Sequence, residues 1–374
     1  MLQTSWRVCY FWTYSLPASM LSQLFDDSPA HARRKVTGLF AILLGANLAV
    51  WLWAFAAFRD SPLLLGTAFL AYSFGLRHAF DADHIAAIDN VTRKMMQEGR
   101  YPIAAGFFFS LGHSTVVVGL ALAVALMTTA LQSRFDTLKD IGGLIGTSVS
   151  ALFLFAIAFA NILVLIQVCR ALQAARRGRR LDAEDVDNIL AKRGLLGRLL
   201  RPAFVMIERS WQLYPLGLLF GLGFDTATEI GVLGISAAQA AHGLSIWSIL
   251  IFPALFTVGM SLMDTTDSTV MVGAYGWAFV KPIRKLYYNI TITFASVVTA
   301  LVIGGIEVLG LIGDRFGLDG PVWRFIAMLT DNFGMVGYSI VGFFIVCWIA
   351  SYLIYRAGGL DRLEAQEAKT SPRG

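Results

Sequence analysis

Residues 37–58, TGLFAILLGANLAVWLWAFAAF, carry no charged side chain and are long enough to cross a bilayer as one helix. A helix rises 1.5 Å per residue, so about 20 apolar residues span a hydrocarbon core about 30 Å thick. Comparable runs bounded by charge follow along the chain, and together these runs predict an all-α integral membrane protein with eight transmembrane helices. The seven further runs lie at 62–88, 102–131, 143–169, 213–240, 246–274, 286–312 and 326–355.

The composition agrees with a membrane protein and excludes other classes. Of the 374 residues, 56% are hydrophobic and only 15% are charged, which is more apolar than an ordinary soluble domain. Short segments of alternating polarity, typical of a β-barrel, do not recur. The net charge of +5 on such a chain does not indicate a nucleic-acid partner, and we expect the lipid bilayer to surround the protein instead.

The distribution of lysine and arginine predicts the orientation, because these residues are in excess on the cytoplasmic side of a membrane. With both termini cytoplasmic, 24 of the 30 basic residues lie inside. We therefore expect a multi-pass protein of the bacterial inner membrane with both termini in the cytoplasm. The predicted division is a cytoplasmic segment (1–36), a first transmembrane half (37–169), a basic cytoplasmic loop (170–212), a second transmembrane half (213–355) and a cytoplasmic tail (356–374).

The two halves carry a weak internal repeat. FDADHI at 80–85 is similar to FDTATEI at 224–230, and FSLGHS at 109–114 is similar to FTVGMS at 256–261. Under the predicted topology the first segment of each pair runs in the opposite direction to the second. Many transporters consist of such inverted-topology halves, so we predict an inverted repeat in this chain.

Ionisable side chains are concentrated inside the predicted spans, where each costs several kcal/mol unless it faces a partner or a cavity. Each is therefore a functional candidate. Glu307, in the run 286–312, is either a group that supports the site or a residue that packs helices. The first half contributes one dense cluster and one further histidine, and the second half contributes three acids. The candidates are His78, Asp81, Asp83, His84 and His113, followed by Asp225, Glu229 and Asp264.

The geometry of a continuous helix does not decide which aspartate, Asp81 or Asp83, would bind the ion. His78, Asp81 and His84 would share one helical face, whereas Asp83 would point away from it. Asp83 could bind alongside the histidines only if the helix were broken or unwound there, which membrane proteins tolerate where the backbone lines a cavity. Arg77 stands four residues before Asp81 and could pair with it, which would make Asp81 structural.

Imidazole together with carboxylate suits nickel, cobalt, zinc or iron. We interpret the cluster as a binding site for a transported divalent transition-metal ion, against the alternative of a polar cluster that joins helices by hydrogen bonds. An intramembrane metalloenzyme is the second hypothesis, but the chain has a single histidine cluster. The membrane component of a multi-subunit importer is the third, and it would need an ATPase partner because no Walker A motif is present. We therefore predict a permease, not an enzyme, without a cofactor.

Four blocks of these residues resemble the nickel/cobalt transporter (NiCoT) family. RHAFDADHI at 77–85 is similar to that family's motif in its second helix. FxxGHSTVV at 109–117, LGFDTATE at 222–229 and GMxxxDT at 259–265 are similar to its motifs in helices three, five and six. The resemblance is closest to the bacterial high-affinity nickel permeases.

The resemblance implies a single-chain permease that takes up Ni²⁺, with Co²⁺ as a second candidate, without an ATPase subunit. It also implies that His78, Asp83 and His84 form the signature metal site. Efflux relatives carry a histidine-rich loop, and this sequence has none, which favours uptake.

Overall fold

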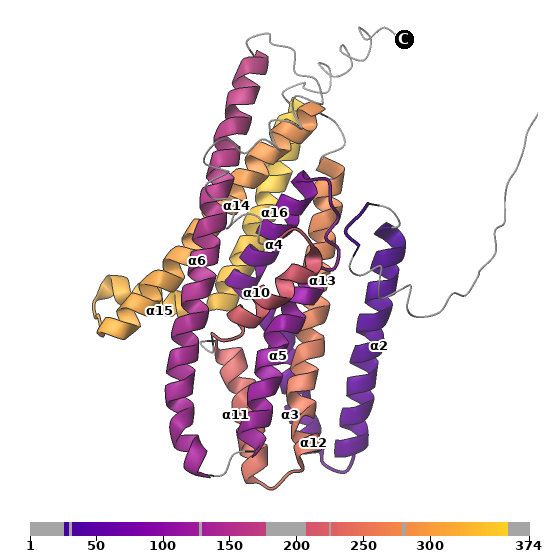
Figure 1. Cartoon of the computed structure of the whole chain (residues 1–374), viewed down its shortest axis with the longest axis vertical. Helices are drawn as coiled ribbons and strands as arrows, with labels where there is room; N and C mark the ends of the chain where they lie inside the picture. The colour runs from indigo at the N-terminus through magenta and orange to yellow at the C-terminus, as the bar shows by residue number, and fades with distance from the viewer. Residues whose placement is uncertain are drawn as a thin grey trace, which may run out of the picture.

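The computed structural model describes residues 26–29, 32–126, 129–176, 207–223, 226–278 and 282–357. Every regular element in these ranges is a helix, which confirms the predicted all-α class (Figure 1). The elements are α2 (Ala32–Phe58), α3 (Pro62–His78), α4 (Ala82–Gln97), α5 (Ala105–Leu126), α6 (Thr129–Arg176), the 3-10 helix η1 (Ser210–Gln212), α10 (Leu213–Phe220), α11 (Ala227–Ala241), α12 (Ile246–Ile249), α13 (Ile251–Ala278), α14 (Pro282–Phe316), α15 (Pro321–Asp331) and α16 (Phe333–Ala357).

Six helical segments within the described residues are long and apolar enough to cross a membrane. The other two predicted spans, 62–88 and 213–240, fall on pairs of shorter helices, of which the longest is α3 with 17 residues. The eight-span topology therefore stays a prediction. The six segments are Ala32–Phe58, Ala105–Leu126, Ile141–Leu163, Ile246–Gly276, Ile290–Phe316 and Phe333–Ser351.

The predicted continuous helix over 62–88 is wrong, because the helix stops at His78 and restarts at Ala82. The amide of Phe80 donates to the carbonyl of Arg77 at 3.0 Å, a tighter turn than an α-helix makes. Asp81 then adopts an extended conformation (φ −65°, ψ 144°) and forms the N-cap of α4. Aspartate disfavours a helix interior, which agrees with the interruption, although the Asp81 carboxylate makes no cap hydrogen bond here.

The predicted helix over 213–240 is broken in a similar way. α10 ends at Phe220, and α11 begins after the extended N-cap Thr226 (φ −89°, ψ 141°). Gly221 and Gly223 lie in the interruption, and glycine is a poor helix former. The predicted helix over 326–355 also divides, since Asn332 separates α15 from α16.

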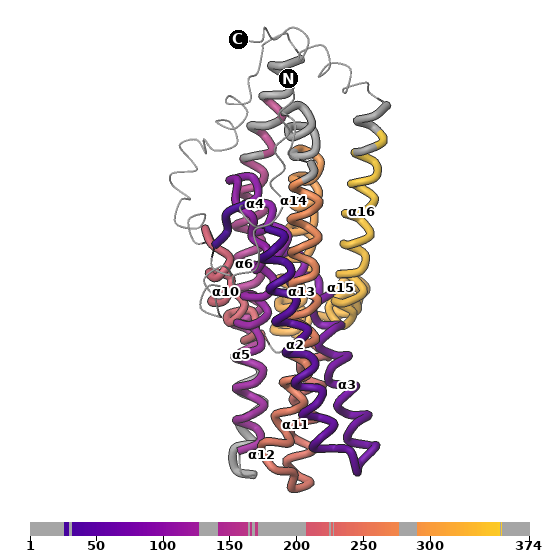
Figure 2. The backbone as a smooth tube through the Cα atoms, turned by 90° about the vertical axis from the view of Figure 1, so that its right-hand side faces the viewer, coloured from indigo at the N-terminus to yellow at the C-terminus, as the bar shows by residue number. Residues whose placement is uncertain are grey.

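The outer helices expose apolar side chains that suit a lipid surrounding. Leu44, Leu48 and Leu52 form a stripe along α2 at four-residue spacing, and each is more than half exposed. The interior holds three apolar clusters, one of which packs α4 and α6 against α14 and α16 around Ile85 and Leu154. Figures 1 and 2 show the α11–α12 turn and the start of α3 at one end of the molecule, with α16 extending toward the other end.

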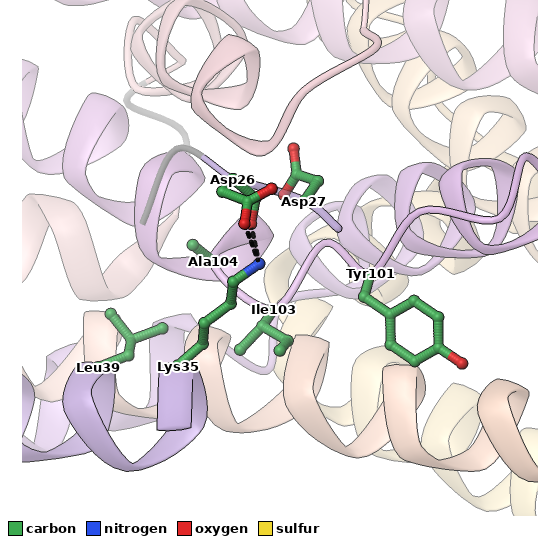
Figure 3. Close-up of a pocket in the computed structure, with 7 residues that line it drawn as sticks. All are labelled: Asp26, Asp27, Lys35, Leu39, Tyr101, Ile103 and Ala104. Atoms are coloured by element: carbon green, nitrogen blue, oxygen red, sulfur yellow. Dashed lines mark hydrogen bonds and ion pairs between the residues drawn. The ribbon is translucent and has the colours of Figure 1, made fainter. Parts of the chain in front are cut away.

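At the end of the bundle where α2 begins, polar contacts tie the preceding segment to the helices (Figure 3). The ammonium of Lys35 lies 3.3 Å from the Asp26 carboxylate and donates to the carbonyl oxygens of Asp26 and Ser28. The Asp27 carboxylate accepts hydrogen bonds from the Ser210 amide (2.8 Å) and hydroxyl (2.5 Å). Burial raises the pKa of the Asp27 carboxyl, and the two Ser210 hydrogen bonds oppose that rise.

Replacing Asp27 with alanine should lower the thermal stability of the protein in detergent. The change removes two hydrogen bonds to Ser210 and leaves a buried donor unsatisfied, which costs about 1–3 kcal/mol. A thermal-unfolding curve measures the loss. Asp60→Ala is the control, because the Arg59–Asp60 pair is exposed to solvent, and equal midpoints for the two variants would contradict the expectation.

Candidate metal site

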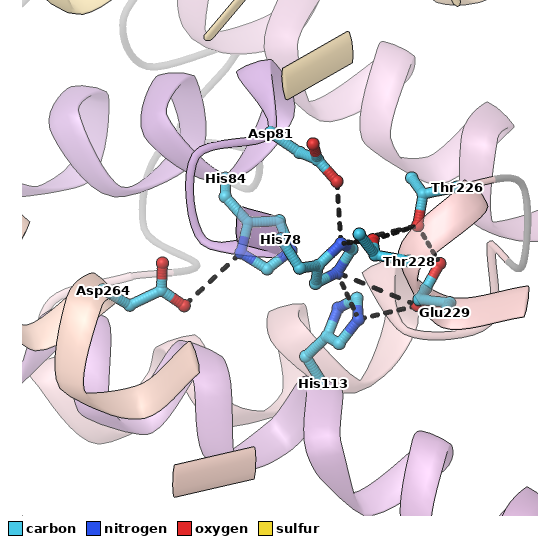
Figure 4. A network of polar contacts seen from close by, with 8 residues as sticks. All are labelled: His78, Asp81, His84, His113, Thr226, Thr228, Glu229 and Asp264. Atoms are coloured by element: carbon cyan, nitrogen blue, oxygen red, sulfur yellow. Dashed lines mark hydrogen bonds and ion pairs between the residues drawn. The ribbon is translucent and has the colours of Figure 1, made fainter. Parts of the chain in front are cut away.

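Three buried histidines from three helices meet in the interior of the bundle (Figure 4). His78 ends α3, His84 lies in the first turn of α4, and His113 lies midway along α5. Each is at most 2% exposed, and one ring nitrogen from each lies within 4.8 Å of the others. The break at residues 79–81 matters here, because it lets His78 and His84 approach from two helix ends.

Glu229 of α11 joins the histidines and brings a negative charge. The Nε2 atoms of His78 and His113 are 3.0 Å apart, and Glu229 Oε1 lies 2.8 Å from the His113 atom and 3.9 Å from the His78 atom. Ligands about 2.05 Å from a common ion are separated by about 2.9 Å when adjacent and about 4.1 Å when opposite. The three atoms are therefore spaced as donors around one metal ion would be.

The other nitrogen of His78 is held by an acid, which orients the ring. Asp81 Oδ2 lies 2.7 Å from His78 Nδ1. When Nδ1 carries the proton and donates to this carboxylate, Nε2 presents its lone pair to His113 and Glu229. A carboxylate behind a ligating imidazole fixes its tautomer and raises its basicity, so Asp81 is suited to support a ligand.

His84 is held in a similar way from the opposite side. Asp264 Oδ2 of α13 lies 3.4 Å from His84 Nδ1, and no described residue hydrogen-bonds to the buried Nε2 atom. The His84 ring also packs edge-on against Phe109, with centroids 4.8 Å apart. His84 can therefore offer a further nitrogen toward the histidine cluster while Asp264 positions its ring.

The position of Glu229 at the start of α11 makes a buried carboxylate tolerable. The side chain is fully buried, and the Thr226 hydroxyl donates to Oε2 at 2.9 Å. Glu229 also lies in the first helical turn, where the helix dipole favours an anion. These contacts fix one oxygen and leave Oε1 directed at His113.

The structure thus brings together His78, His84 and His113 from the predicted set, with Asp81 and Asp264 behind two of the rings. Asp83 lies half-buried in the first turn of α4, and because the helix restarts at Ala82 the single-helix geometry does not apply to it. That Asp83 is a metal ligand stays a prediction, and so do the roles of the other site residues. Asp225 lies outside the described residues.

Two threonines of the site were not identified from the sequence. Thr228 Oγ1 lies 3.1 Å and Thr226 Oγ1 3.4 Å from His78 Nδ1. The signal was present, because Thr226-x-x-Glu229 has the spacing of a helix-start motif inside a run that we interpreted as one continuous helix.

Comparisons with known proteins agree with this site. The model of the NicO family, described as high-affinity nickel-transport protein, matches residues 64–354. The high-affinity nickel transport protein of Cupriavidus necator is 55% identical over 347 residues, covering 93% of this chain and 99% of that one. The hydrogenase nickel incorporation protein HupN of Bradyrhizobium diazoefficiens is 53% identical over 318 residues, or 85% of this chain and 83% of that one.

A more distant relative is named a cobalt transport protein. The cobalt transport protein NhlF of Rhodococcus rhodochrous is 41% identical over 323 residues, covering 85% of this chain and 90% of that one. No solved structure matches the chain. The family match and the coverage of these relatives lead to one conclusion: the chain belongs to the family of high-affinity nickel-transport proteins.

Proposed function

We propose that this chain takes up Ni²⁺ across the bacterial inner membrane and binds the ion in transit between His78, His113 and Glu229, with His84 beside them. The observation that carries the proposal is the convergence of three donor atoms, separated by 2.8–3.9 Å, from helices of both halves. Its family consists of transporters and not of enzymes. Cobalt accepts the same ligands, and the name of the Rhodococcus relative supports Co²⁺ as a second substrate.

Uptake of radiolabelled nickel by cells that express the chain tests this function. The host should lack nickel transporters of its own and any ATPase partner for them, because the proposal is that the single chain suffices. Competition with unlabelled cobalt measures the preference between the two ions. An absence of uptake by a chain that reaches the membrane would contradict the proposal.

Glu229→Gln should reduce nickel uptake by at least about 10- to 100-fold, the range that loss of a group supporting a metal ligand produces. The substitution keeps the shape and a carbonyl oxygen but removes the charge that faces His113. Initial rates normalised to the amount of membrane protein measure the effect. The matched control is Glu208→Gln at an exposed position, which should transport normally. Equal rates in both variants would remove Glu229 from the site.

The proposed transport mechanism uses the inverted repeat. In support, each broken helix resumes after an extended N-cap, Asp81 or Thr226, and places a site residue three positions later, His84 or Glu229. In Figure 1 the chain runs from α3 up to α4 but from α10 down to α11, as the inverted arrangement requires.

Close helix contacts support the same repeat. A Cβ atom on Gly75 would overlap the carbonyl oxygen of Phe256, and one on Gly217 would overlap that of Phe109. Phe256 and Phe109 occupy matching positions in the two aligned motifs, so the first part of each broken helix packs on the same position of the other half. We propose that the halves 37–169 and 213–355 reorient about the shared site and expose it to each side in turn.

The proposed topology has eight crossings with both termini in the cytoplasm. Reporter enzymes fused after Arg176 and at the C-terminus should both report a cytoplasmic location, and one fused in the short turn after Arg59 should report the exterior. α6 and α16 end toward the same end of the molecule, in agreement with this arrangement (Figure 1). An exterior signal at Arg176 or at the C-terminus would overturn it.

A further inference from the structure

A cavity of about 720 Å³ lies between α6, α11, α14 and α15, beside the histidine cluster. Asp314, Arg315 and Asp331 line it and are exposed, whereas Glu307 lines it and is only 6% exposed. The cavity thus extends from an exposed, charged rim to a buried carboxylate. Among the described residues none of the predicted metal-site residues lines the cavity, but Thr226 and Ile230, which flank Glu229 at the start of α11, do.

The helix α15 covers this cavity with one of its two faces. Trp323, Ile326, Ala327 and Thr330 line the cavity at spacings of three and four residues, so they share one helical face. Val322, Phe325 and Met328 are 66%, 55% and 50% exposed and do not line it. The exposed apolar face of α15 is suited to contact lipid. The opposite face closes one side of a cavity that contains polar groups.

Glu307 is held in place at the inner part of the cavity. The Ser150 hydroxyl of α6 donates to Glu307 Oε1 at 2.7 Å, which joins α6 to α14. A buried carboxylate is expensive in a membrane protein and marks ion pathways by default. Glu307 lies at the contact between α6 and α14 and also lines the cavity, so its carboxylate faces a space that a cation can enter, which favours the pathway over simple helix packing.

The cavity reaches the metal site through Thr226. This residue lines the cavity, and its hydroxyl donates to Glu229 Oε2 while lying 3.4 Å from His78 Nδ1. The Glu229 carboxylate contacts Thr226 through one oxygen and His113 through the other. A short polar path therefore leads from the cavity to the donor atoms.

We infer that this cavity is the vestibule through which a hydrated divalent cation reaches the histidine cluster from the outer side, with the Glu307 carboxylate as its inner binding station. The inference rests on the proposed function and on the proposed topology, under which the end of α14 lies outside. Three carboxylates and one guanidinium line the cavity among the described residues, so its net charge attracts cations. Six waters occupy about 180 Å³, so a fully hydrated ion fits.

A pair of neighbouring cysteine substitutions on α15 tests the route. Ala327 lines the cavity and Met328 does not, yet both are exposed and both variants keep the same native cysteines. A positively charged, membrane-impermeant thiol reagent added outside intact cells should reduce nickel uptake of the Ala327→Cys variant to the background of a non-transporting variant. It should leave Met328→Cys unchanged. Nickel added first should slow the inhibition at Ala327→Cys.

Glu307→Gln tests the binding station. The glutamine retains an oxygen to accept from Ser150 but loses the charge, so kcat/KM for nickel should fall about tenfold through a higher KM, as expected for lost electrostatic attraction. Ser150→Ala removes the hydrogen bond and keeps the charge, so its loss in kcat/KM should be clearly smaller than that of Glu307→Gln. An equal loss in the two variants would assign Glu307 to helix packing and overturn the station.

The outcomes separate this inference from the function on which it rests. Uptake that persists in Ala327→Cys after the reagent, or an unchanged kcat/KM in Glu307→Gln, would overturn the vestibule while the wild-type chain still transports nickel. A chain that reaches the membrane and carries no nickel would instead remove the proposed function itself.

Discussion

The His78→Ala variant should lose at least about 100-fold in nickel uptake while still reaching the membrane. His78 is the centre of the cluster, because one ring nitrogen faces His113 and Glu229 and the other binds Asp81. The substitution removes a donor and leaves the Asp81 carboxylate buried without its imidazole partner. Loss of a group that merely supports a ligand costs 10- to 100-fold, so a direct ligand should exceed that range.

Radiolabelled uptake and nickel binding to the purified protein should fail together in this variant. His242→Ala is the control, because His242 is the exposed C-cap residue of α11 and lies outside the cluster. We expect His84→Ala and Asp83→Ala to abolish uptake as well. Normal transport by any two of the three site variants would eliminate the assigned metal site.

Gly337→Leu should reduce uptake by at least tenfold although Gly337 contacts no ion. A Cβ atom at this position of α16 would overlap the carbonyl oxygen of Phe80, which lies in the break between α3 and α4. A leucine therefore has to displace either α16 or the unwound segment that holds His78 and Asp81. Displacing reacting groups by about 1 Å can cost 100-fold, which sets the scale of the expected loss.

Gly342→Leu provides the matched control on the same helix, since a Cβ atom there would meet nothing within 4 Å. Uptake should be retained in this variant and lost in Gly337→Leu at comparable amounts of membrane protein. If Gly337→Leu transports as well as Gly342→Leu, the contact of α16 with the break does not position the site.

The helical class was predictable because long apolar runs have few structural solutions in a membrane. The breaks at Asp81 and Thr226 were not, since hydropathy averages over a run and does not register backbone conformation. Both positions nevertheless carried a local signal. Asp81 and Thr226 are favourable N-cap residues within runs that we treated as continuous helices.

Part of the candidate site was likewise predictable from the sequence, and part was not. The histidines were identifiable because ionisable groups inside a bilayer are costly and were concentrated in a short stretch. The contact of Glu229 with His113 joins residues 116 positions apart, so only the packing of α11 on α5 reveals it. The sequence predicted Glu229 as a candidate of the second half, but it did not predict this direct contact.

The donors at the site come from both halves of the chain. His78 and His113 lie on α3 and α5 of the first half, whereas Glu229 lies on α11 of the second. A bound ion would therefore act as a cross-link, and the free energy of coordination would be shared across the interface between them. A site of micromolar affinity represents about 8 kcal/mol at 25 °C, and giving up one of its bonds would lower this free energy and speed release. A relative displacement that withdraws one carboxylate would loosen the ion without any change in the histidines.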